Sequence, residues 1–412
     1  MRAHGLLSLG VIACAPPPAA RAPGQVRPGI EVLLSDSIHL VQGQRLGLLT
    51  NQAGVDRLGR RDADRLIAAN LRLAALFSPE HGWRGAEDRP GLPDAVDSTT
   101  GLPIYSLYGG SRAAARAALD GVDVLLVDLQ DIGARYYTYI STAASLMREA
   151  AARGKRILVL DRPDPIGGDL VQGNVRASAG DPDSEFVGFL PVPMRHGMTI
   201  GELARLADDV LGLHARPTVI PAAGWRRAVS YDSTGLPWTR PSPNMPELES
   251  AFHYPGLCLF EGTNVAVGRG TPVAFQVIGA PWIDPAAILR RLEGARGAER
   301  SALDGVTILP TDFTPRAPSD GKYDAVRLRG LKFRVTDRAR YDPTRVAVAL
   351  LVALQRLYPF DFQFRPESFD RLAGGPELRA EIEAGRSEPV IAASWVEPLA
   401  RFRRTRAKYL LY

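Results

Sequence analysis

Between residues 29 and 164, short runs of aliphatic residues alternate with stretches whose apolar side chains recur at helical spacing. The aliphatic runs are typical of strands buried on both faces, and the spaced pattern is typical of amphipathic helices. This alternation predicts an α/β domain with a Rossmann-like, doubly wound parallel sheet. The predicted strands are 46–50, 71–77, 122–127 and 156–160; the helices are 63–70, one capped by Ser111 and ended by Gly121, and one from about Ile140 to Gly154.

The second half of the chain mixes helix and strand patterns without this alternation. Residues 199–202 form a capping-box motif, and Asp-Pro pairs at 284–285 and 342–343 each place an N-cap and a first-turn proline before an apolar helix. In 331–335, apolar and basic residues alternate, which is typical of a half-exposed strand. We therefore expect a Rossmann-like domain at 29–215 and a smaller α+β domain at 216–412.

The N-terminal residues resemble an export signal. Arg2 and His4 precede the apolar stretch 6–13, and Cys14 follows, the pattern of a bacterial lipoprotein signal. Residues 15–28, rich in proline, glycine and alanine, favour an unstructured tether. We expect residues 1–14 to direct export and Cys14 to be lipidated, which would anchor the protein to the cell envelope on its periplasmic or outer face. The alternative is an ordinary tail whose start is misassigned.

Composition and motifs exclude several classes of function. The 412 residues carry a formal charge of +5 (50 basic minus 45 acidic), without a dense basic stripe, so nucleic acid is not an expected partner. No dinucleotide-binding, P-loop, zinc-protease or serine-hydrolase motif occurs, so a nicotinamide or flavin site and a serine-hydrolase mechanism are not expected. With Cys14 assigned to lipidation, Cys258 is expected to be a lone buried thiol.

Polar residues follow all four predicted strands, at 50–52, 78–82, 128–133 and 161–165. The carboxyl ends of parallel strands meet at one sheet edge, where ligands bind. Asp161 and Asp164 could equally be structural residues in caps or turns or functional residues of the site. Glu80 is the strongest catalytic candidate, because glutamate is not a preferred cap or turn former and Pro79 and Gly82 fix its backbone.

Carboxylates beside aromatic residues suit a carbohydrate substrate. Cleavage of a glycosidic bond needs a carboxylic acid to protonate the leaving oxygen, and usually a second group to assist attack at the anomeric carbon. Aromatic faces can stack on the apolar faces of sugar rings, although each candidate could equally be a core residue. The aromatic candidates are Trp83, Tyr136, Tyr137, Tyr139, Trp225 and Trp238.

Phe77-Ser78-Pro79-Glu80-His81-Gly82 and six further segments, in consistent order, resemble the NamZ-type exo-β-N-acetylmuramidases. The other segments are 105–109, 128–139, 160–168, 195–202, 236–246 and 260–271. The resemblance runs from about residue 29 to the C-terminus. It implies a Rossmann-like domain and a smaller second domain with the active site between them. It also implies release of N-acetylmuramic acid from non-reducing ends of peptidoglycan fragments, without a cofactor.

The resemblance places the family's proposed catalytic glutamate at Glu80. The family's second acid is not assigned, and the candidates are Asp128, Asp131 and Glu261. Relatives could carry the second acid at the position where this chain has Gln172. In that case the catalytic role of this position would be in doubt here, because glutamine is not an acid.

Muramic acid differs from glucosamine by a lactyl ether, which carries a free carboxylate when no peptide is attached. A charge-assisted, ideally bidentate arginine contact should recognise this group. The arginines within the motif segments are Arg135, Arg162, Arg195 and Arg269, of which Arg135 and Arg269 are favoured. Asn51, Asn244 and Asn264 suit hydroxyl or acetamido groups, and His81 could orient Glu80 or a water molecule. Tyr137, His196 and Glu261 complete the expected substrate-binding set.

Two other functions fit parts of the pattern. A substrate-binding lipoprotein would share the signal and the two domains but would need no acid. A metal-dependent hydrolase could use Asp128, Asp131 and His81 as ligands, although no two histidines have a tight ligand spacing.

Overall fold

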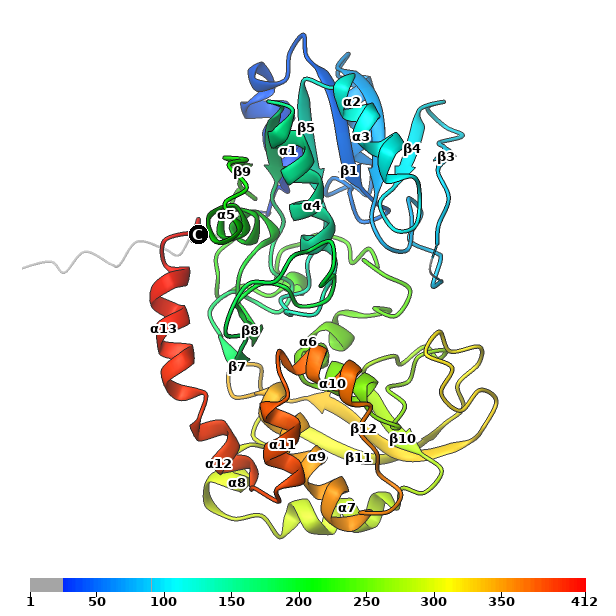
Figure 1. The fold of residues 1–412 in the computed structure, drawn as a ribbon, viewed down its shortest axis with the longest axis vertical. Coiled ribbons are helices and arrows are strands. Elements are labelled where there is room, and N and C mark those ends of the chain that lie inside the picture. The colour runs from blue at the N-terminus through cyan, green and yellow to red at the C-terminus, as the bar shows by residue number, and fades with distance from the viewer. Residues whose placement is uncertain (1–24, 90) are drawn as a thin grey trace, which may run out of the picture.

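The computed structural model describes residues 25–89 and 91–412, and the chain forms two lobes (Figure 1). Cys14 and the predicted signal lie outside the described residues, as does most of the predicted tether. Among the described residues, none of the helices combines the length and apolar character needed to cross a membrane.

The first lobe is built on a seven-stranded sheet with the order β3-β4-β2-β1-β5-β6-β9. All neighbouring strands are parallel except β3 and β4 at one edge. The six parallel strands follow the order of a doubly wound Rossmann sheet, which confirms the predicted fold class. The strands are β1 (Arg45–Thr50), β2 (Arg72–Ser78), β3 (Ala95–Val96), β4 (Pro103–Ser106), β5 (Val124–Asp128), β6 (Arg156–Leu160) and β9 (Thr218–Ile220).

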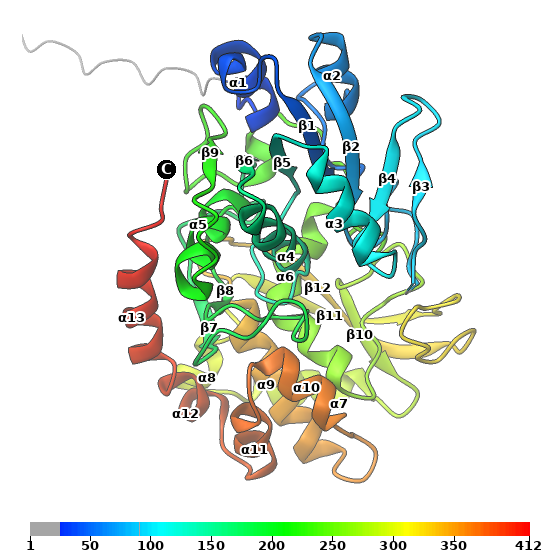
Figure 2. The same cartoon turned by 45° about the horizontal axis from the view of Figure 1, so that its top comes forward.

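Helices cover both faces of this sheet because each strand sends alternate side chains to opposite faces. Leu126 and Leu158 pack with α1 and α2, whereas Leu125 and Ile157 belong to the main core that includes α3, α4 and α5. The helices are α1 (Gly29–Asp36), α2 (Asp62–Ala68), α3 (Arg112–Asp120), α4 (Tyr139–Ala152) and α5 (Ile200–Leu211). A two-stranded ribbon, β7 (Gln172–Val175) and β8 (Pro193–Arg195), lies between the lobes (Figure 2).

The predicted caps are present. The Ser111 hydroxyl accepts a hydrogen bond from the Ala114 amide at the start of α3, and Thr199 and Glu202 form the reciprocal capping box of α5. Asp284 and Asp342 cap the helices that follow them in the second lobe. These helix starts are fixed by local chemistry, since each cap satisfies backbone donors that the helix leaves free.

The C-terminal lobe contains an antiparallel sheet with the order β10-β12-β11, formed by β10 (Val277–Ala280), β11 (Val306–Phe313) and β12 (Leu328–Val335). Leu331 and Phe333 of β12 are buried and Lys332 and Arg334 are exposed, which confirms the predicted alternation. The lobe's helices are α6 (Leu248–Leu257), α7 (Pro285–Glu293), α8 (Gly297–Ser301), α9 (Pro343–Leu357), α10 (Pro366–Ala373), α11 (Glu377–Glu383) and α12 (Glu388–Ala393), with 3-10 turn η3 (Cys258–Gly262) after α6.

The chain crosses between the lobes more than once. Strand β9, at residues 218–220, pairs with β6 in the first sheet, beyond the expected boundary at residue 215. The last helix, α13 (Val396–Arg406), returns along the side of the molecule to the first lobe (Figure 1). There Arg406 donates to the carbonyls of Gly168, His196 and Gly197, and the hydroxyl of Tyr412 donates to Asp161. The first lobe is therefore completed by the C-terminal residues.

Candidate active site

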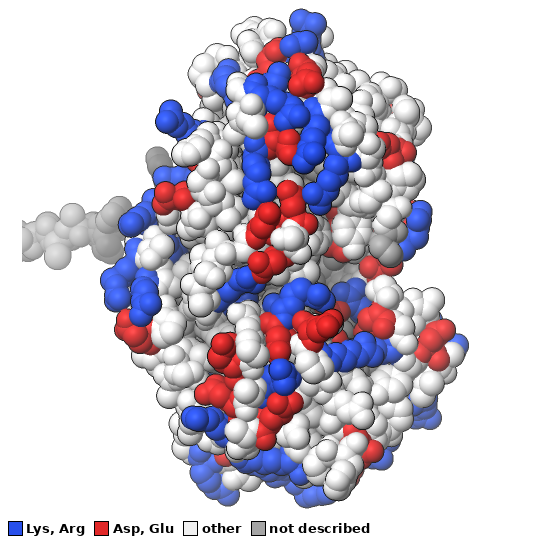
Figure 3. Space-filling view, viewed as in Figure 1, with Lys and Arg blue, Asp and Glu red and all other residues white. Residues whose placement is uncertain are grey.

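A cavity of about 420 Å³ lies between the lobes, beyond the carboxyl ends of β2 and β5. This volume is within the range of sites that bind small ligands. Acidic and basic side chains gather at the waist between the lobes (Figure 3). The lining residues of the first lobe are Glu80, His81, Asp88, Arg89, Tyr108, Tyr136 to Tyr139 and Val187; later residues include Ser242, Asn244, Met245, Tyr254, Cys258, Glu261, Arg269, Phe275, Ser319, Asp320, Arg365, Ser368, Arg371 and Leu372.

Glu80 is half-buried in this cavity, two residues after the end of β2. The Thr138 hydroxyl donates to Glu80 Oε2 at 2.6 Å, which orients the carboxyl and leaves Oε1 for other contacts. Tyr108 stands on the same wall, and its pKa is raised to about 12 by burial and by the nearby charge of Glu80. A carboxyl group therefore reaches the cavity with one oxygen held by a neighbouring hydroxyl.

His81 follows in a left-handed conformation, with φ of 69°. This conformation is uncommon for a residue other than glycine. The turn places its Nδ1 atom 2.7 Å from the carbonyl oxygen of Glu87 and 3.7 Å from a carboxylate oxygen of Asp88. His81 therefore links the glutamate turn to the loop that carries Asp88.

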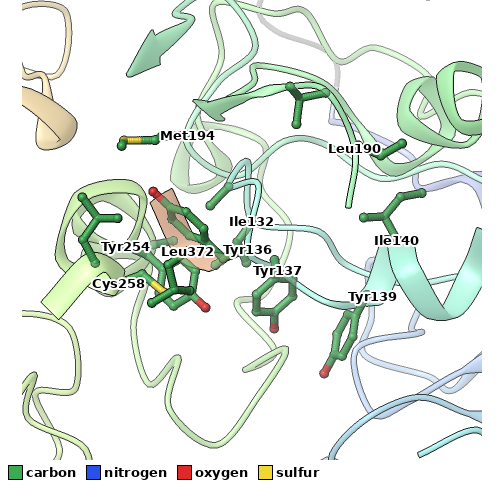
Figure 4. Packing of buried hydrophobic residues seen from close by; sticks show 14 of the residues in the cluster. Ile132, Tyr136, Tyr137, Tyr139, Ile140, Leu190, Met194, Tyr254, Cys258 and Leu372 are labelled. Carbon is green, nitrogen blue, oxygen red and sulfur yellow. The ribbon is translucent and has the colours of Figure 1, made fainter. Parts of the chain in front are cut away.

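Three tyrosines after β5 form an aromatic wall of the cavity (Figure 4). The Tyr136 hydroxyl donates to the Pro255 carbonyl at 2.8 Å, and the Tyr139 hydroxyl donates to the Pro241 carbonyl. The Tyr137 hydroxyl is buried and has no hydrogen-bond partner among the described residues. Tyr137 can therefore offer a ring face and a hydroxyl group to a ligand.

One cluster of polar side chains lies on the side of the cavity toward the C-terminal lobe and consists of Asp88, Asn244 and Arg269. Asn244 Nδ2 donates to Asp88 Oδ2 at 2.6 Å, and Arg269 Nη1 is 3.7 Å from the same oxygen. Burial favours the neutral form of Asp88, but hydrogen bonds from Ser319 and Asn244 and the Arg269 charge outweigh it and lower its pKa. Asp88 is therefore a carboxylate at neutral pH.

Arg269 also donates through Nε to Glu261, and this ion pair raises the Arg269 pKa against the opposing effect of burial. The backbone around Glu261 is held by Lys322, whose Nζ donates to the carbonyls of Phe260, Glu261 and Val265 at 3.0–3.1 Å. Burial lowers the pKa of Lys322 to about 8. Glu261 and Arg269 thus both line the cavity, and each neutralises the charge of the other.

Six of the expected site residues line the cavity, namely Glu80, His81, Tyr137, Asn244, Glu261 and Arg269. Among the aromatic candidates, the three tyrosines line it, whereas Trp83, Trp225 and Trp238 do not.

The expected acids Asp128 and Asp131 do not line the cavity. Asp128 is fully buried and accepts two hydrogen bonds from Arg162, whose Nη2 also donates to the Val55 carbonyl. Asp131 accepts from the Gly133 amide at 2.7 Å and lies 3.4 Å from His196 Nε2. These two acids and their partners Arg162 and His196 stabilise the loops at the sheet edge instead of facing a ligand.

Arg135, favoured for the lactyl carboxylate, is buried beneath the cavity wall. Its guanidinium donates to the carbonyls of Asn174, Val192 and Leu372 and stacks 5.4 Å from the Tyr136 ring. Arg195 is likewise buried and donates to the Ile166 carbonyl. The Nη donors of both guanidinium groups are used by the fold, because a buried guanidinium requires partners.

Asn51 and Asn264 also make local contacts in place of cavity contacts. Asn51 Oδ1 accepts from the Ala53 amide at 3.0 Å, and Asn264 bridges the chain at Asp361 and Gln363. Gln172 lies in β7, where it donates to the Tyr341 carbonyl and accepts from Arg195, and it does not line the cavity.

The suggested metal ligands are not gathered in the structure. His81 is in the cavity, whereas Asp128 and Asp131 are engaged at the sheet edge. Within residues 25–89 and 91–412, His, Cys, Asp and Glu side chains form no group of three or more that could hold a metal ion.

Sequence reasoning missed several lining residues, including Asp88, Thr138, Arg365 and Arg371. Thr138 lies in segment 128–139, one of the segments that resemble the family. This resemblance was the only sequence signal that could have pointed to Thr138. Asp88 follows a motif on an irregular loop, whereas Arg365 immediately precedes α10 and Arg371 belongs to it, in the other lobe. No local pattern marks them as neighbours of Glu80.

Comparisons with known proteins match the sequence and fold of this chain. Residues 46–249 match the family model of exo-beta-N-acetylmuramidase NamZ, N-terminal, and residues 252–412 match the C-terminal model of the same family. A Bacillus subtilis protein named peptidoglycan beta-N-acetylmuramidase NamZ is 40% identical over 392 residues, covering 94% of this chain and 92% of the relative.

Two crystal structures of DUF1343 family proteins from Bacteroides fragilis share the architecture. They have TM-scores of 0.83 and 0.72 and are 34% and 32% identical, and each alignment covers 94% of this chain and 99% of the other. Family models that match both lobes, together with a relative of 40% identity across nearly the whole length, establish that this chain belongs to the NamZ family of exo-β-N-acetylmuramidases.

Proposed function

We propose that this protein is an exo-acting glycoside hydrolase that releases N-acetylmuramic acid from the non-reducing ends of peptidoglycan fragments. The observation that carries the proposal is the Glu80 carboxyl group, which faces an aromatic-walled cavity between the lobes. The similarity to the Bacillus subtilis muramidase supports the same reaction and substrate. The products fit a role in cell-wall turnover and recycling.

Glu80 acts as the general acid in this proposal. Its Oε2 atom accepts the Thr138 hydrogen bond, so that Oε1 carries the proton toward the glycosidic oxygen. Protonation of this oxygen lets the bond to the anomeric carbon break and gives an oxocarbenium-like transition state. Tyr137, Tyr139 and Tyr254 supply aromatic surface beside the sugar ring.

Asp88 acts as the second carboxylate. The pKa of Asp88 is lowered, so its side chain is ionised at neutral pH. It is therefore available as a base or as a negative charge beside the developing oxocarbenium ion. Asp128 and Asp131, two of the earlier candidates, are engaged outside the cavity, and Glu261 is paired with Arg269. His81 contacts both the Glu80 turn and the Asp88 loop, which suits a positioning role.

Glu80→Gln tests the acid. The change keeps the size of the side chain but removes the transferable proton, and loss of a general acid should lower kcat by about 10²–10⁴-fold. The assay is chromophore release from an N-acetylmuramide whose leaving group needs protonation, together with muramic acid release from a disaccharide.

Glu149→Gln is the matched control, because Glu149 lies on α4 of the first lobe and does not line the cavity. It should retain wild-type activity. Activity of Glu80→Gln near wild type would remove Glu80 from the role of acid.

The alternative predicted from the sequence, a substrate-binding lipoprotein without catalysis, is not favoured, because the chain belongs to a family of muramidases. It would bind muramyl saccharides in the same cavity without breaking a bond. Incubation of the wild-type protein with a muramic acid-terminated disaccharide distinguishes the two, since only the hydrolase yields free N-acetylmuramic acid.

We further propose that the protein is exported and lipid-anchored through Cys14. The apolar stretch 6–13 followed by cysteine supports this proposal. Cys14→Ser should abolish labelling by a fatty-acid probe in a bacterial host and move the protein from the membrane fraction to the soluble fraction. Unchanged labelling of Cys14→Ser would contradict it, and Cys258→Ser serves as the control.

A further inference from the structure

The charged side chains that line the cavity differ in whether they have a partner of opposite charge. Glu261 is paired with Arg269, and Asp88 lies within 3.7 Å of Arg269. Asp320 lies 3.8 Å from Lys322, and Arg89 is paired with Glu87 on the loop. Most of the charged side chains that line the cavity therefore have a partner of opposite sign.

Arg365 and Arg371 differ from the other arginines. Both line the cavity, from the start and the last turn of α10, and both are exposed. Among the described residues, neither guanidinium makes an ion pair or a hydrogen bond, although the Arg365 backbone is bonded to Gly262 at 2.8 Å. Two cations without a protein anion thus face a cavity whose catalytic carboxyl group lies on the other lobe.

This arrangement suits an anionic substituent of the ligand. Guanidinium groups recognise carboxylates through charge-assisted hydrogen bonds, and a site with two of them can hold both carboxylate oxygens. The arginines favoured from sequence do not fill this role, because Arg135 is bound to backbone carbonyls and Arg269 is neutralised by Glu261.

We propose that Arg365 and Arg371 bind the lactyl carboxylate of N-acetylmuramic acid and thereby select the muramyl sugar over N-acetylglucosamine. This assignment rests on the proposed function and names the residues that set its substrate. The C-terminal lobe then supplies specificity through α10, and the first lobe supplies the acid. The sugar must span both lobes to react.

The test compares Arg365→Gln, Arg371→Gln and the double variant on two substrates. One is a chromogenic N-acetylmuramide with a free lactyl carboxylate, and the other is its carboxamide. For wild type, the free acid should be the better substrate. Each single variant should lose about 10- to 100-fold in kcat/KM on the free acid, which corresponds to one hydrogen bond to a charged group. On the carboxamide, which offers only a neutral acceptor, the same variants should lose much less than on the free acid.

Arg334→Gln is the charge-matched control, since Arg334 is an exposed arginine of β12 on the same lobe outside the cavity. It should behave as wild type on both substrates. Equal losses on the free acid and the carboxamide, or no loss on either, would overturn the assignment.

Binding and turnover separate this inference from the proposed function. If wild type hydrolyses neither muramide, the proposed function fails. Calorimetry then measures N-acetylmuramic acid against its carboxamide directly. Tighter binding of the free acid by wild type, lost in the double variant, supports the arginine site even without turnover, whereas equal binding of the two ligands refutes it.

Discussion

Replacement of Asn244 with alanine removes one of the hydrogen bonds that keep Asp88 ionised. Asn244 Nδ2 donates to Asp88 Oδ2 at 2.6 Å, and the asparagine is buried. A hydrogen bond to a charged group contributes about 1.5–3 kcal/mol. We take the lower end, because the Asp88 side chain is 29% exposed and water replaces part of the loss. Since one pKa unit corresponds to about 1.4 kcal/mol, the Asp88 pKa should rise by about one unit.

This change has a definite sign in a pH profile of activity. The Asp88 pKa is below its ordinary value, so the carboxylate is lost only at acidic pH. If the ionised form is the active one, the acidic limb of kcat/KM against pH reports its titration in the free enzyme. In Asn244→Ala this limb should move to higher pH by about one unit. Chromophore release from an N-acetylmuramide across the acidic and neutral range measures the shift.

Ser368→Ala is the control, because Ser368 lines the same cavity and is not among the groups that hydrogen-bond to Asp88. Its acidic limb should stay at the wild-type position. An unmoved limb in a folded Asn244→Ala variant would refute the role of Asp88. An equal movement in Ser368→Ala would trace the shift to a general change in the cavity.

Three further predictions concern stability and are measured by urea unfolding. Arg406→Gln should lower the free energy of unfolding by about 2–3 kcal/mol, because it removes charge-assisted hydrogen bonds to buried carbonyls. The same change at the exposed neighbour Arg404 should lower the free energy of unfolding by less than about 0.5 kcal/mol. An equal loss in the two variants would contradict the role given to Arg406. Arg162→Met should cost about 3–5 kcal/mol, because it leaves Asp128 buried without its cation; unchanged stability would contradict a stabilising role of the Arg162–Asp128 pair. Burial raises the Asp164 pKa to about 7, so the native state keeps a proton that the unfolded state has released, and stability falls as pH rises toward 7. Asp164→Asn should reduce this fall between about pH 5 and pH 7 by about 2 kcal/mol, and a fall of unchanged size would exclude Asp164 as its source.

The fold class and most elements of the first lobe were predictable because their signals are local. The predicted strand 122–127 overlaps β5, and the Ser111, Thr199, Asp284 and Asp342 caps start helices where expected. Periodicity and capping act over a few residues, so they survive in the linear pattern. The return of α13 to the first lobe could not be predicted, because it depends on contacts such as that between Tyr412 and Asp161.

The candidate site was predictable only in part. Glu80 stood out because its residue type did not suit its turn, and it does face the cavity. The motifs did not separate residues that face the cavity from residues that build its walls. Asp128 and Arg135 belong to the same segment as the lining residues Tyr136 to Tyr139, yet their side chains are buried and paired.

The sequence by itself determined the strands, the capped helices, the glutamate turn and the family, since each depends on residue types at short spacing. Only the tertiary structure decided which charges remain available to a ligand. A guanidinium is neutralised or free according to what packs against it: Arg269 is paired with Glu261 and also lies 3.7 Å from Asp88 of the first lobe, whereas Arg365 lines the cavity without an ion pair among the described residues. Such pairing depends on distances in space between residues far apart in the chain, and linear spacing carries no record of them.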